Sequence, residues 1–470
     1  MLFSTCHLTS LLALIALAGC SQSVSTTAAE LPQAQSDAGH SDSASPDNSK
    51  TDTGPIFTDL SSAPVGAKVT IFGSGLGTTG DVTLGGTKQT VDEHTDNYVV
   101  FTVSGAGGDL LIGTRPIGKL PVHAGKVLEA TPRNLKSVWA AAKPGDVVYM
   151  RAGTYRDISG EGDWAMDSTL ETYKHGKALL PIALLAYPGE RAIIEQFSPD
   201  AHSPVALGDG QRRHAAYLTF ANFEVVATDV CIGGGGDTSD SRGGPDETGA
   251  DYIRIVNLQC QLTRASGNTM TGMISVQGDG WKILGSTFID PANREIINNN
   301  HGIYIQNGAD DVEVAYNRLV NLHMGHVIQV HQDGKPKLYE RVSIHDNLLE
   351  AQRPGDMRGI NVANVDDNST FTIERNTLRN LGQDFSGVAV YRGHAVVKDN
   401  QFFKVRAPNI VANGQAGGSR HVVASGNRFE TVQGYKAIAA ENGATLADLR
   451  LSGNRYCGLS PQESSPKPCR

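Results

Sequence analysis

Four of the chain's 14 histidines lie between positions 301 and 331, close to a tyrosine and a following arginine. Removal of a proton α to a carboxylate needs a base, a group that stabilises the developing enolate charge, and a proton donor. Imidazole titrates near neutral pH and suits the base, and the bidentate fork of arginine suits the carboxylate. We therefore expect His331 or His326 as the base and Arg358 as the carboxylate clamp. Tyr304 would be the acid, or the base if ionised, and His301 either joins this catalytic set or is a turn residue bonded to backbone.

Hydrolysis of a glycosidic bond would instead need two carboxylates about 5–10 Å apart. The segments that carry the histidines supply none at their centre, because Glu441 lies too far along the chain. Asp310 and Asp311 fall in a turn sequence, where acidic residues are common. Asp333 and Asp356 could reach the same place from loops, so hydrolysis stays open.

The candidate residues belong to short segments that alternate aliphatic and polar side chains, as in GIYIQ and VIQVH. In a strand, this period of two sends the aliphatic residues to one face and the polar residues to the other. Strands stacked about 4.8 Å apart would join the polar residues into one strip that suits the hydroxyls of a sugar chain. We expect the strip to bind substrate through Gln277, Gln306, Gln329, Asn361, Tyr391, Arg392 and Asn413.

An internal repeat sets the positions of these segments. An asparagine recurs every 24–31 residues before a hydrophobic strand end, with Ser286 filling one gap: Asn257, Asn317, Asn347, Asn376, Asn400, Asn427 and Asn454. A drifting period with short β segments and no helical pattern predicts a right-handed parallel β-helix over residues 131–457, with about eleven coils. The asparagine is expected to adopt a left-handed bend and to stack on the asparagine of the next coil.

The beginning of this domain carries a capping helix and a recognisable pattern. Residues 135–142 have helical spacing, with Asn134 as a possible N-cap, and the helix would cover the open end of the solenoid. The following A-x-PGD-x and GTY segments resemble the opening of secreted polysaccharide-active β-helix proteins, including polysaccharide lyases of the alginate and chondroitin type and mannuronan C-5 epimerases. The resemblance implies the fold and a polysaccharide substrate. It does not transfer catalytic residues, because the KS…RHG, DPHD, and paired-aspartate with GHG signatures are missing.

Residues 55–124 form short alternating segments separated by glycine, a pattern typical of a small antiparallel β-sandwich. The run VTIFGSGLG followed by DVTLGG resembles the immunoglobulin-like IPT/TIG domain. That resemblance implies a spacer or a binding module. A phosphate-binding loop is a poor alternative, because no GKS/T ending follows.

The N-terminus is predicted to direct export. Residues 8–18 are an apolar run of signal-peptide length, and the following LAGC resembles the lipobox of bacterial lipoproteins. The resemblance implies a signal peptide over 1–19, lipidation of Cys20, and, with Ser21 next, an outer-membrane destination. An ordinary secretory signal is the alternative, and both place the protein in the cell envelope or outside the cell. Residues 20–54 are expected to be a disordered tether, because they lack aromatic residues and are rich in Ser, Thr and Asp.

Four further cysteines fit an oxidising compartment. We expect Cys231–Cys260 to join neighbouring coils and Cys457–Cys469 to fasten the C-terminal tail, residues 458–470. No CxxC spacing indicates a metal site. The acidic loop at 233–251 could bind calcium, although a solvated loop is the preferred interpretation. The sequence indicates no other cofactor.

The net charge of −9 disfavours nucleic acid as a partner. It also disfavours a polyanionic substrate unless a local basic patch overrides it. The expected partners are therefore a polysaccharide and, through Cys20, a membrane, and the protein is expected to be a monomer.

The first functional hypothesis is a lyase that cleaves a uronate-containing glycan by β-elimination. A uronate epimerase or a glycoside hydrolase on the same fold remains an alternative, as does a non-catalytic glycan-binding surface protein or adhesin. A binder would depend on exposed aromatic platforms, and the strip offers only Tyr304 and Tyr391. This favours the enzyme.

Overall fold

The computed structural model describes residues 56–156, 170–196, 203–208, 215–228, 230–234, 249–263, 272–290, 301–322, 325–332, 334–353, 357–382, 385–415, 417–432 and 434–457. Predictions for residues 1–54 and for the tail at 458–470 therefore lie outside the described residues. No described helix is long and apolar enough to cross a membrane.

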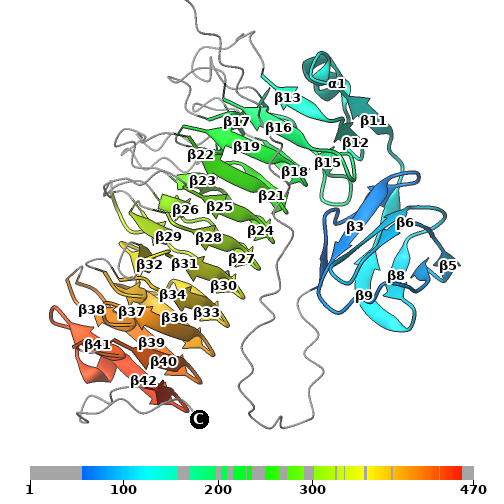
Figure 1. Ribbon diagram of the computed structural model, residues 1–470. Coiled ribbons are helices and arrows are strands. Elements are labelled where there is room, and N and C mark those ends of the chain that lie inside the picture. The colour runs from blue at the N-terminus through cyan, green and yellow to red at the C-terminus, as the bar shows by residue number, and fades with distance from the viewer. Residues whose placement is uncertain are drawn as a thin grey trace, which may run out of the picture. The chain divides into compact units, whose positions relative to one another are not determined.

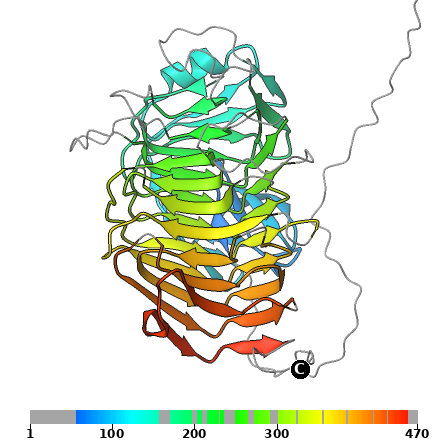
Figure 2. The same cartoon turned by 90° about the vertical axis from the view of Figure 1, so that its left-hand side faces the viewer.

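Three parallel sheets wind into a right-handed β-helix, which confirms the predicted fold class (Figure 1). Each complete coil contributes one strand to each sheet, and Figure 2 shows these strands stacked along the solenoid. The first sheet has twelve strands: β11 (Val127–Ala130), β12 (Val147–Met150), β15 (Ile182–Ala186), β18 (Ala216–Ala221), β21 (Asp251–Val256), β24 (Lys282–Leu284), β27 (Glu313–Ala315), β30 (Val342–His345), β33 (Thr370–Glu374), β36 (Gly393–Lys398), β39 (Arg420–Ser425) and β42 (Leu449–Ser452).

Strands of the second and third sheets follow the first-sheet strand in each complete coil. The second sheet has eleven strands: β13 (Gly153–Tyr155), β16 (Ala192–Glu195), β19 (Glu224–Ala227), β22 (Gln259–Leu262), β25 (Thr287–Ile289), β28 (Arg318–Val320), β31 (Leu348–Glu350), β34 (Thr377–Arg379), β37 (Gln401–Val405), β40 (Arg428–Thr431) and β43 (Arg455–Cys457). The third has ten: β14 (Leu170–Glu171), β17 (Val205–Ala206), β20 (Ile232–Gly233), β23 (Gly272–Gln277), β26 (His301–Gln306), β29 (His326–His331), β32 (Arg358–Ala363), β35 (Val388–Val390), β38 (Ile410–Asn413) and β41 (Ile438–Glu441).

Aliphatic side chains fill the interior, as the alternation predicts. Ile274, Ile303, Ile328 and Ile360 lie at matching positions of four consecutive strands of the third sheet and are at most 1% exposed. This inward set fixes the opposite, polar set on the outer face.

Helix α1 (Leu135–Ala141) packs Leu135 and Trp139 onto this core, as expected of a cap. It ends one residue earlier than predicted, because Ala142 is extended. Asn134 occupies the N-cap position but makes no side-chain cap bond, and its side-chain oxygen instead accepts a hydrogen bond from the backbone N–H of Thr131, at 2.6 Å.

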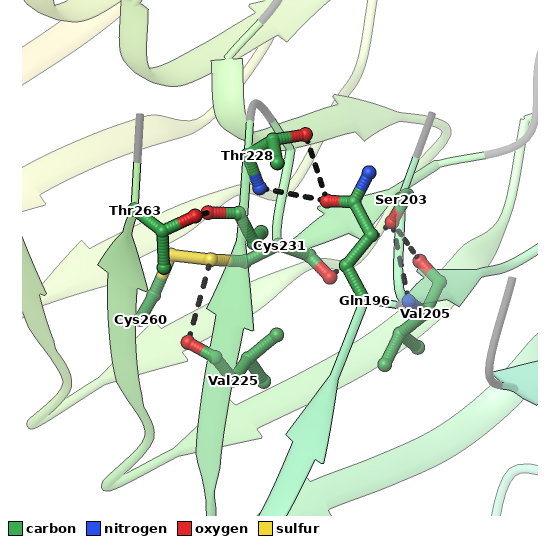
Figure 3. Close-up of a disulfide and its surroundings, with 9 residues drawn as sticks. Gln196, Ser203, Val205, Val225, Thr228, Cys231, Cys260 and Thr263 are labelled. Carbon is green, nitrogen blue, oxygen red and sulfur yellow. Dashed lines mark hydrogen bonds between the residues drawn. A yellow bond between two sulfur atoms is a disulfide. The ribbon is translucent and has the colours of Figure 1, made fainter. Parts of the chain in front are cut away.

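A disulfide joins Cys231, just before β20, to Cys260 in β22, with Cα atoms 6.1 Å apart (Figure 3). The predicted pairing between neighbouring coils is confirmed. Cys457 is also disulfide-bonded, whereas Cys469, its predicted partner, lies outside the described residues.

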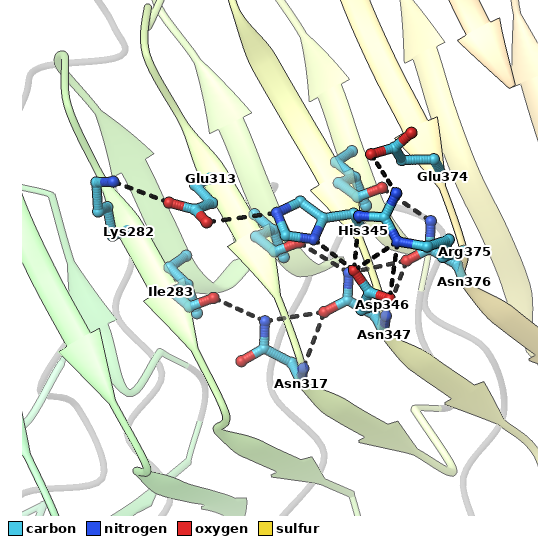
Figure 4. Close-up of polar contacts among 12 residues, drawn as sticks. Lys282, Ile283, Glu313, Asn317, His345, Asp346, Asn347, Glu374, Arg375 and Asn376 are labelled. Atoms are coloured by element: carbon cyan, nitrogen blue, oxygen red, sulfur yellow. Dashed lines mark hydrogen bonds and ion pairs between the residues drawn. The ribbon is translucent and has the colours of Figure 1, made fainter. Parts of the chain in front are cut away.

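The repeating asparagines form a continuous hydrogen-bonded ladder inside the bend between the first and second sheets (Figure 4). The side-chain oxygen of Asn376 accepts the backbone N–H of Asn347 at 3.0 Å, and its amide donates to the Ile344 carbonyl at 2.8 Å. The same pattern runs from Asn317 to Asn454, and Ser286 begins it by donating its backbone N–H to the Asn317 side chain.

Two details of the predicted ladder are wrong. The left-handed conformation belongs to the residue before each asparagine, such as Tyr316 (φ 62°) or Asp346 (φ 54°), so that the asparagine itself turns inward. Asn257 is such a bend residue (φ 50°), and Leu258 takes the inward position in that coil. The repeat therefore begins one residue out of phase with the prediction.

Ion pairs across coils cover the outside of this bend. Glu313 lies between Lys282 at 2.9 Å and His345 at 3.3 Å, and Asp346 lies between His345 and Arg375. The hydrogen bond from His345 lowers the pKa of Glu313 to about 2. Against the opposing effect of burial, the two carboxylates raise the pKa of His345.

Before the solenoid, two four-stranded antiparallel sheets form the predicted β-sandwich. One sheet contains β1 (Phe57–Thr58), β3 (Lys68–Phe72), β7 (Tyr98–Thr102) and β6 (Thr90–His94), and the other contains β5 (Thr87–Lys88), β4 (Val82–Leu84), β8 (Gly108–Ile112) and β9 (Arg115–Leu120). The short strands β2 (Ala63–Pro64) and β10 (Val122–His123) pair separately.

The sandwich core continues into the outer face of the first sheet. Small and aliphatic residues there, including Ala183, Val256 and Ala315, belong to one buried cluster with the sandwich. The Tyr149 hydroxyl accepts the Lys68 backbone N–H at 2.8 Å and donates to the Lys68 carbonyl at 2.6 Å. The sandwich is therefore packed against the solenoid.

A buried carboxyl lies in this contact. Asp59 is fully buried and accepts hydrogen bonds from the backbone of Thr70 and from the side chain of Asn222. Burial raises the pKa of Asp59 to about 6 and lowers that of nearby Arg254 to about 10.

Asn376→Ala should lower the free energy of unfolding by about 1–3 kcal/mol, because it leaves buried backbone groups of Asn347 and Ile344 without their partners. Urea unfolding followed by circular dichroism measures the difference. Asn368→Ala is the matched control, since Asn368 is exposed and bonds only within its own turn. Equal effects of the two substitutions would contradict a stabilising ladder.

Asp59 should make stability depend on pH. Because its pKa is raised in the folded chain, the folded state binds the proton more tightly than the unfolded state between about pH 4 and 6. The free energy of unfolding should therefore fall as pH rises through this window, by about 2–3 kcal/mol. In Asp59→Asn this part of the pH dependence of the free energy of unfolding should be absent. Urea titrations at several pH values would detect the difference. Parallel curves for both proteins would refute the assignment.

Candidate functional site

Polar side chains on the outer face of the third sheet lie in two neighbouring columns. In one column, Ser275, Tyr304, Gln329 and Asn361 occupy matching positions of β23, β26, β29 and β32. The second column begins with Gln277 and Gln306, continues with His331, Tyr391 and Asn413 near the ends of later strands, and reaches Glu441 opposite Asn413. The predicted strip is therefore present in the fold.

A third set of side chains lies where the same strands begin. His326 and Arg358 are paired in register, and the rings of His301 and His326 are nearly parallel with centroids 5.9 Å apart. The backbone N–H of His326 donates to His301 Nδ1 at 3.0 Å. Because Nδ1 accepts, a neutral His301 carries its proton on Nε2.

Tyr304 connects the two sets. Its ring meets the edge of His301, with centroids 4.9 Å apart, and its hydroxyl lies 3.3 Å from His331 Nδ1. Thus His301, Tyr304, His326 and His331 form one contact chain, and Arg358 is adjacent on the next strand. We call these five residues the His/Arg cluster.

Sequence reasoning missed Phe385, which precedes β35. Its ring edge contacts His326, with centroids 4.7 Å apart at 88°, and the Arg358 guanidinium carbon lies 4.4 Å from its centre. One aromatic ring therefore holds a histidine and an arginine side by side. Phe385 follows no strand period, so its sequence gave no signal of this role.

The cluster is more enclosed than the predicted open strip. Tyr304 is 3% exposed and His326 7%, whereas His331 is half-buried. Burial, together with the nearby His301, Arg358 and His331, holds the pKa of His326 well below its usual value. His326 is therefore neutral at pH 7, and the low polarity around it strengthens every electrostatic contact.

The predicted substrate-binding amides make few bonds with one another. Gln277 and Gln306 both donate to the Ser275 hydroxyl, at 3.2 and 2.9 Å, and Asn361 donates to Gln329 at 3.4 Å. The buried side-chain oxygens of Gln277 and Asn361 have no hydrogen-bond partner in the described structure. A buried acceptor without a donor is costly, so both oxygens suit a ligand hydroxyl.

Other predicted binding residues have structural contacts. Arg392 forms an ion pair with Asp367 at 2.8 Å, and the Asn413 side chain accepts the backbone N–H of Gln415 at 2.9 Å. Burial, aided by Glu441, raises the pKa of Tyr391. The structure thus supplies other partners for Arg392 and Asn413 than the expected substrate.

The acidic residues considered for hydrolysis or calcium divide into two groups. Asp310 accepts a backbone N–H of the next coil, and Asp311 pairs with Arg341, as turn residues do. Asp333, Asp356 and most of the loop at 233–251 lie outside the described residues. In the described ranges, no group of three or more His, Cys, Asp or Glu side chains is placed to hold a metal ion.

Comparison of the fold gives polysaccharide-active neighbours. An alginate lyase from Paenibacillus sp. is 15% identical, with 70% of this chain and 95% of that chain covered and a TM-score of 0.39. The A-module of a mannuronan C-5 epimerase from Azotobacter vinelandii is 15% identical, covering 70% and 94%, with a TM-score of 0.35. A family 28 exopolygalacturonase from Yersinia enterocolitica is 11% identical, covering 87% and 100%, with a TM-score of 0.36. No family model and no curated protein sequence matches the chain.

Phe385→Ala should raise the pKa of His326 toward its usual value near 6.5, because removal of the ring admits water to the imidazole. Two-dimensional NMR titration of the imidazole protons measures this shift, with the His326 signal assigned by its absence in His326→Gln. Phe385→Leu keeps the apolar cover and should leave most of the shift in place. An unchanged His326 titration in Phe385→Ala would show that the ring does not shield it.

Proposed function

We propose that the protein is a lyase that cleaves a uronate-containing glycan by β-elimination. The observation that carries the proposal is the contact between the Tyr304 hydroxyl and His331 Nδ1, in the same enclosed cluster as Arg358, which is in register with His326. It supplies a base, a proton donor and a cation, which are the three groups that abstraction α to a carboxylate requires.

In this mechanism Arg358 binds the uronate carboxylate and neutral His326 lies beside it. His331 takes the proton from carbon five, and the electron pair forms the double bond between carbons four and five as the bond from carbon four to the glycosidic oxygen breaks. Tyr304 gives its phenolic proton to that leaving oxygen. The proton on His331 then returns to Tyr304 through their hydrogen bond, which restores both residues.

Hydrolysis is less well served by the same geometry. It needs two carboxylates, one as acid and one as base or nucleophile. The five side chains of the His/Arg cluster are imidazoles, a phenol and a guanidinium. Epimerisation would share the first proton transfer and would differ by returning a proton to carbon five from the opposite face.

The proposal includes export and a surface location. The lipobox-like LAGC sequence supports a lipid anchor on Cys20 at the outer membrane, and the Cys231–Cys260 disulfide is consistent with an oxidising compartment. A polysaccharide outside the cell would then be the substrate.

The test follows ultraviolet absorbance of the unsaturated uronate end during incubation with alginate, pectate, chondroitin, hyaluronan and heparin. His331→Ala, Tyr304→Phe and Arg358→Gln should each lower the rate by about 100-fold or more. His421→Ala is the control, because His421 is an exposed histidine on the first sheet.

Each alternative function has its own result in this assay. Exchange of the carbon-five proton with solvent, without absorbance, would indicate an epimerase, and new reducing ends without absorbance would indicate a hydrolase. If the protein binds a glycan and none of these changes occurs, the lyase assignment would give way to that of a non-catalytic adhesin. If His421→Ala loses as much activity as His331→Ala, the active site does not lie in the His/Arg cluster.

A further inference from the structure

Exposed arginines along most of the solenoid are neutralised by acids on neighbouring coils. Arg191 pairs with Glu224 at 2.6 Å, and Arg375 pairs with Asp346 at 2.9 Å. Arg151, Arg156, Arg318, Arg341, Arg379 and Arg392 also have acidic partners. This cross-coil pairing is the expected arrangement for like-sized coils stacked about 4.8 Å apart.

The last coils break this rule on the outer face of the second sheet. Arg428 in β40 lies directly opposite Arg455 in β43, and both side chains are exposed. In the described part of the chain, neither has a carboxylate within ion-pair distance. Like charges facing each other across neighbouring strands destabilise a sheet, so the fold itself does not account for this pair.

Further positive charge surrounds the pair. The guanidinium carbons of Arg428 and Arg379 lie 5.7 and 5.6 Å from the centre of the Phe403 ring. The exposed Lys404 and Arg406 follow this phenylalanine. We define the basic patch as Arg379, Lys404, Arg406, Arg428 and Arg455; Glu350, which pairs with Arg379, and Glu430 are acids on the same face. With five cations and two acids (5 − 2 = +3), the patch is positive on a chain whose net charge is −9.

We propose that the basic patch is a second binding site that holds an anionic glycan chain outside the His/Arg cluster; that its ligand is a uronate chain rests on the proposed function. Guanidinium forks bind carboxylates bidentately, and Arg428 and Arg455 repeat along the stacking direction, which suits a linear polyanion. Arg406 lies in the segment that joins β37 of the second sheet to β38 of the third. A chain bound on the third sheet can therefore continue around this corner onto the patch.

A glycan fits the patch better than an anionic membrane does. Membrane docking adds apolar side chains that enter the lipid. Among the described residues, the large apolar groups at the patch are the half-buried Phe403 and Tyr456, whose exposed ring stacks on Phe429 at the end of the solenoid. The charges instead lie in two neighbouring columns of the sheet. Arg428 and Arg455 are in register in one column, and Arg379 is in register with Phe403 in the other. The Phe403 ring lies close to the guanidinium groups of both Arg379 and Arg428.

Binding is measured in the His331→Ala background, so that no turnover is needed and a failed lyase assay does not affect the result. Affinity electrophoresis and calorimetry with long polygalacturonate and alginate chains are compared for this protein with and without Arg428→Gln plus Arg455→Gln. The double substitution should weaken binding about three- to tenfold at low salt, with a smaller effect at high salt. Affinity for short oligouronates that occupy only the cluster should not change.

The matched control is Arg450→Gln plus Lys177→Gln, which removes the same charge from exposed positions outside the patch. If both double variants bind long chains as tightly as the parent, or lose the same amount, the patch is not a glycan site. If Arg428→Gln plus Arg455→Gln loses binding to vesicles of anionic phospholipid while its glycan binding is unchanged, the patch is a membrane-binding surface and the proposal is overturned.

Discussion

The register between consecutive coils is the constraint on which the rest of the structure depends. Each ladder asparagine accepts a backbone N–H of the coil before it and donates to a carbonyl there, so one side chain fixes two coils together. The residue before it takes the left-handed bend, which turns the chain sharply from the first sheet into the second. Since side chains alternate with a period of two, a slip of one residue would exchange the inner and outer faces of a strand. The ladder therefore also protects the outward columns of the third sheet.

The same register brings the candidate chemistry together from distant parts of the sequence. His301, His326 and Arg358 lie on three successive strands of the third sheet, and Tyr304 and His331 lie three to five residues further along two of them. A phenol, imidazoles and a guanidinium reach contact distance only because β26, β29 and β32 begin at the same level. Enclosure then lowers the local polarity and keeps His326 neutral, so that the cation of Arg358 is opposed by fewer neighbouring charges.

Sequence reasoning succeeded where a period carries the information. Alternation in GIYIQ and VIQVH predicted which residues face outward, and the recurring asparagines predicted the coil length. It failed by one residue at Asn257, because an asparagine favours the left-handed bend as readily as the inward ladder position. Phe385 and the enclosure of Tyr304 could not be predicted, since both depend on irregular segments between strands, whose paths have no period. The packing of the sandwich on the solenoid was also not predicted. The apolar residues Ala183, Val256 and Ala315 on the outer face of the first sheet are the sequence signal that could have indicated it.

The distribution of charge bears on the proposed binding of an acidic polymer by an acidic protein. Ion pairs between coils, such as Glu313 with Lys282, neutralise much of the outer surface and hold stacked strands together. Arg428 and Arg455, which have no acidic partner in the described residues, begin their strands on the second sheet, and Arg406 lies at the corner that leads to the third sheet. Because exposed charges are screened over about 8 Å at physiological salt, a polyanion responds to this local patch more than to the distant net charge. Separating chain capture on the second sheet from proton transfer in the enclosed cluster would let the cluster remain small and dry while the polymer stays attached.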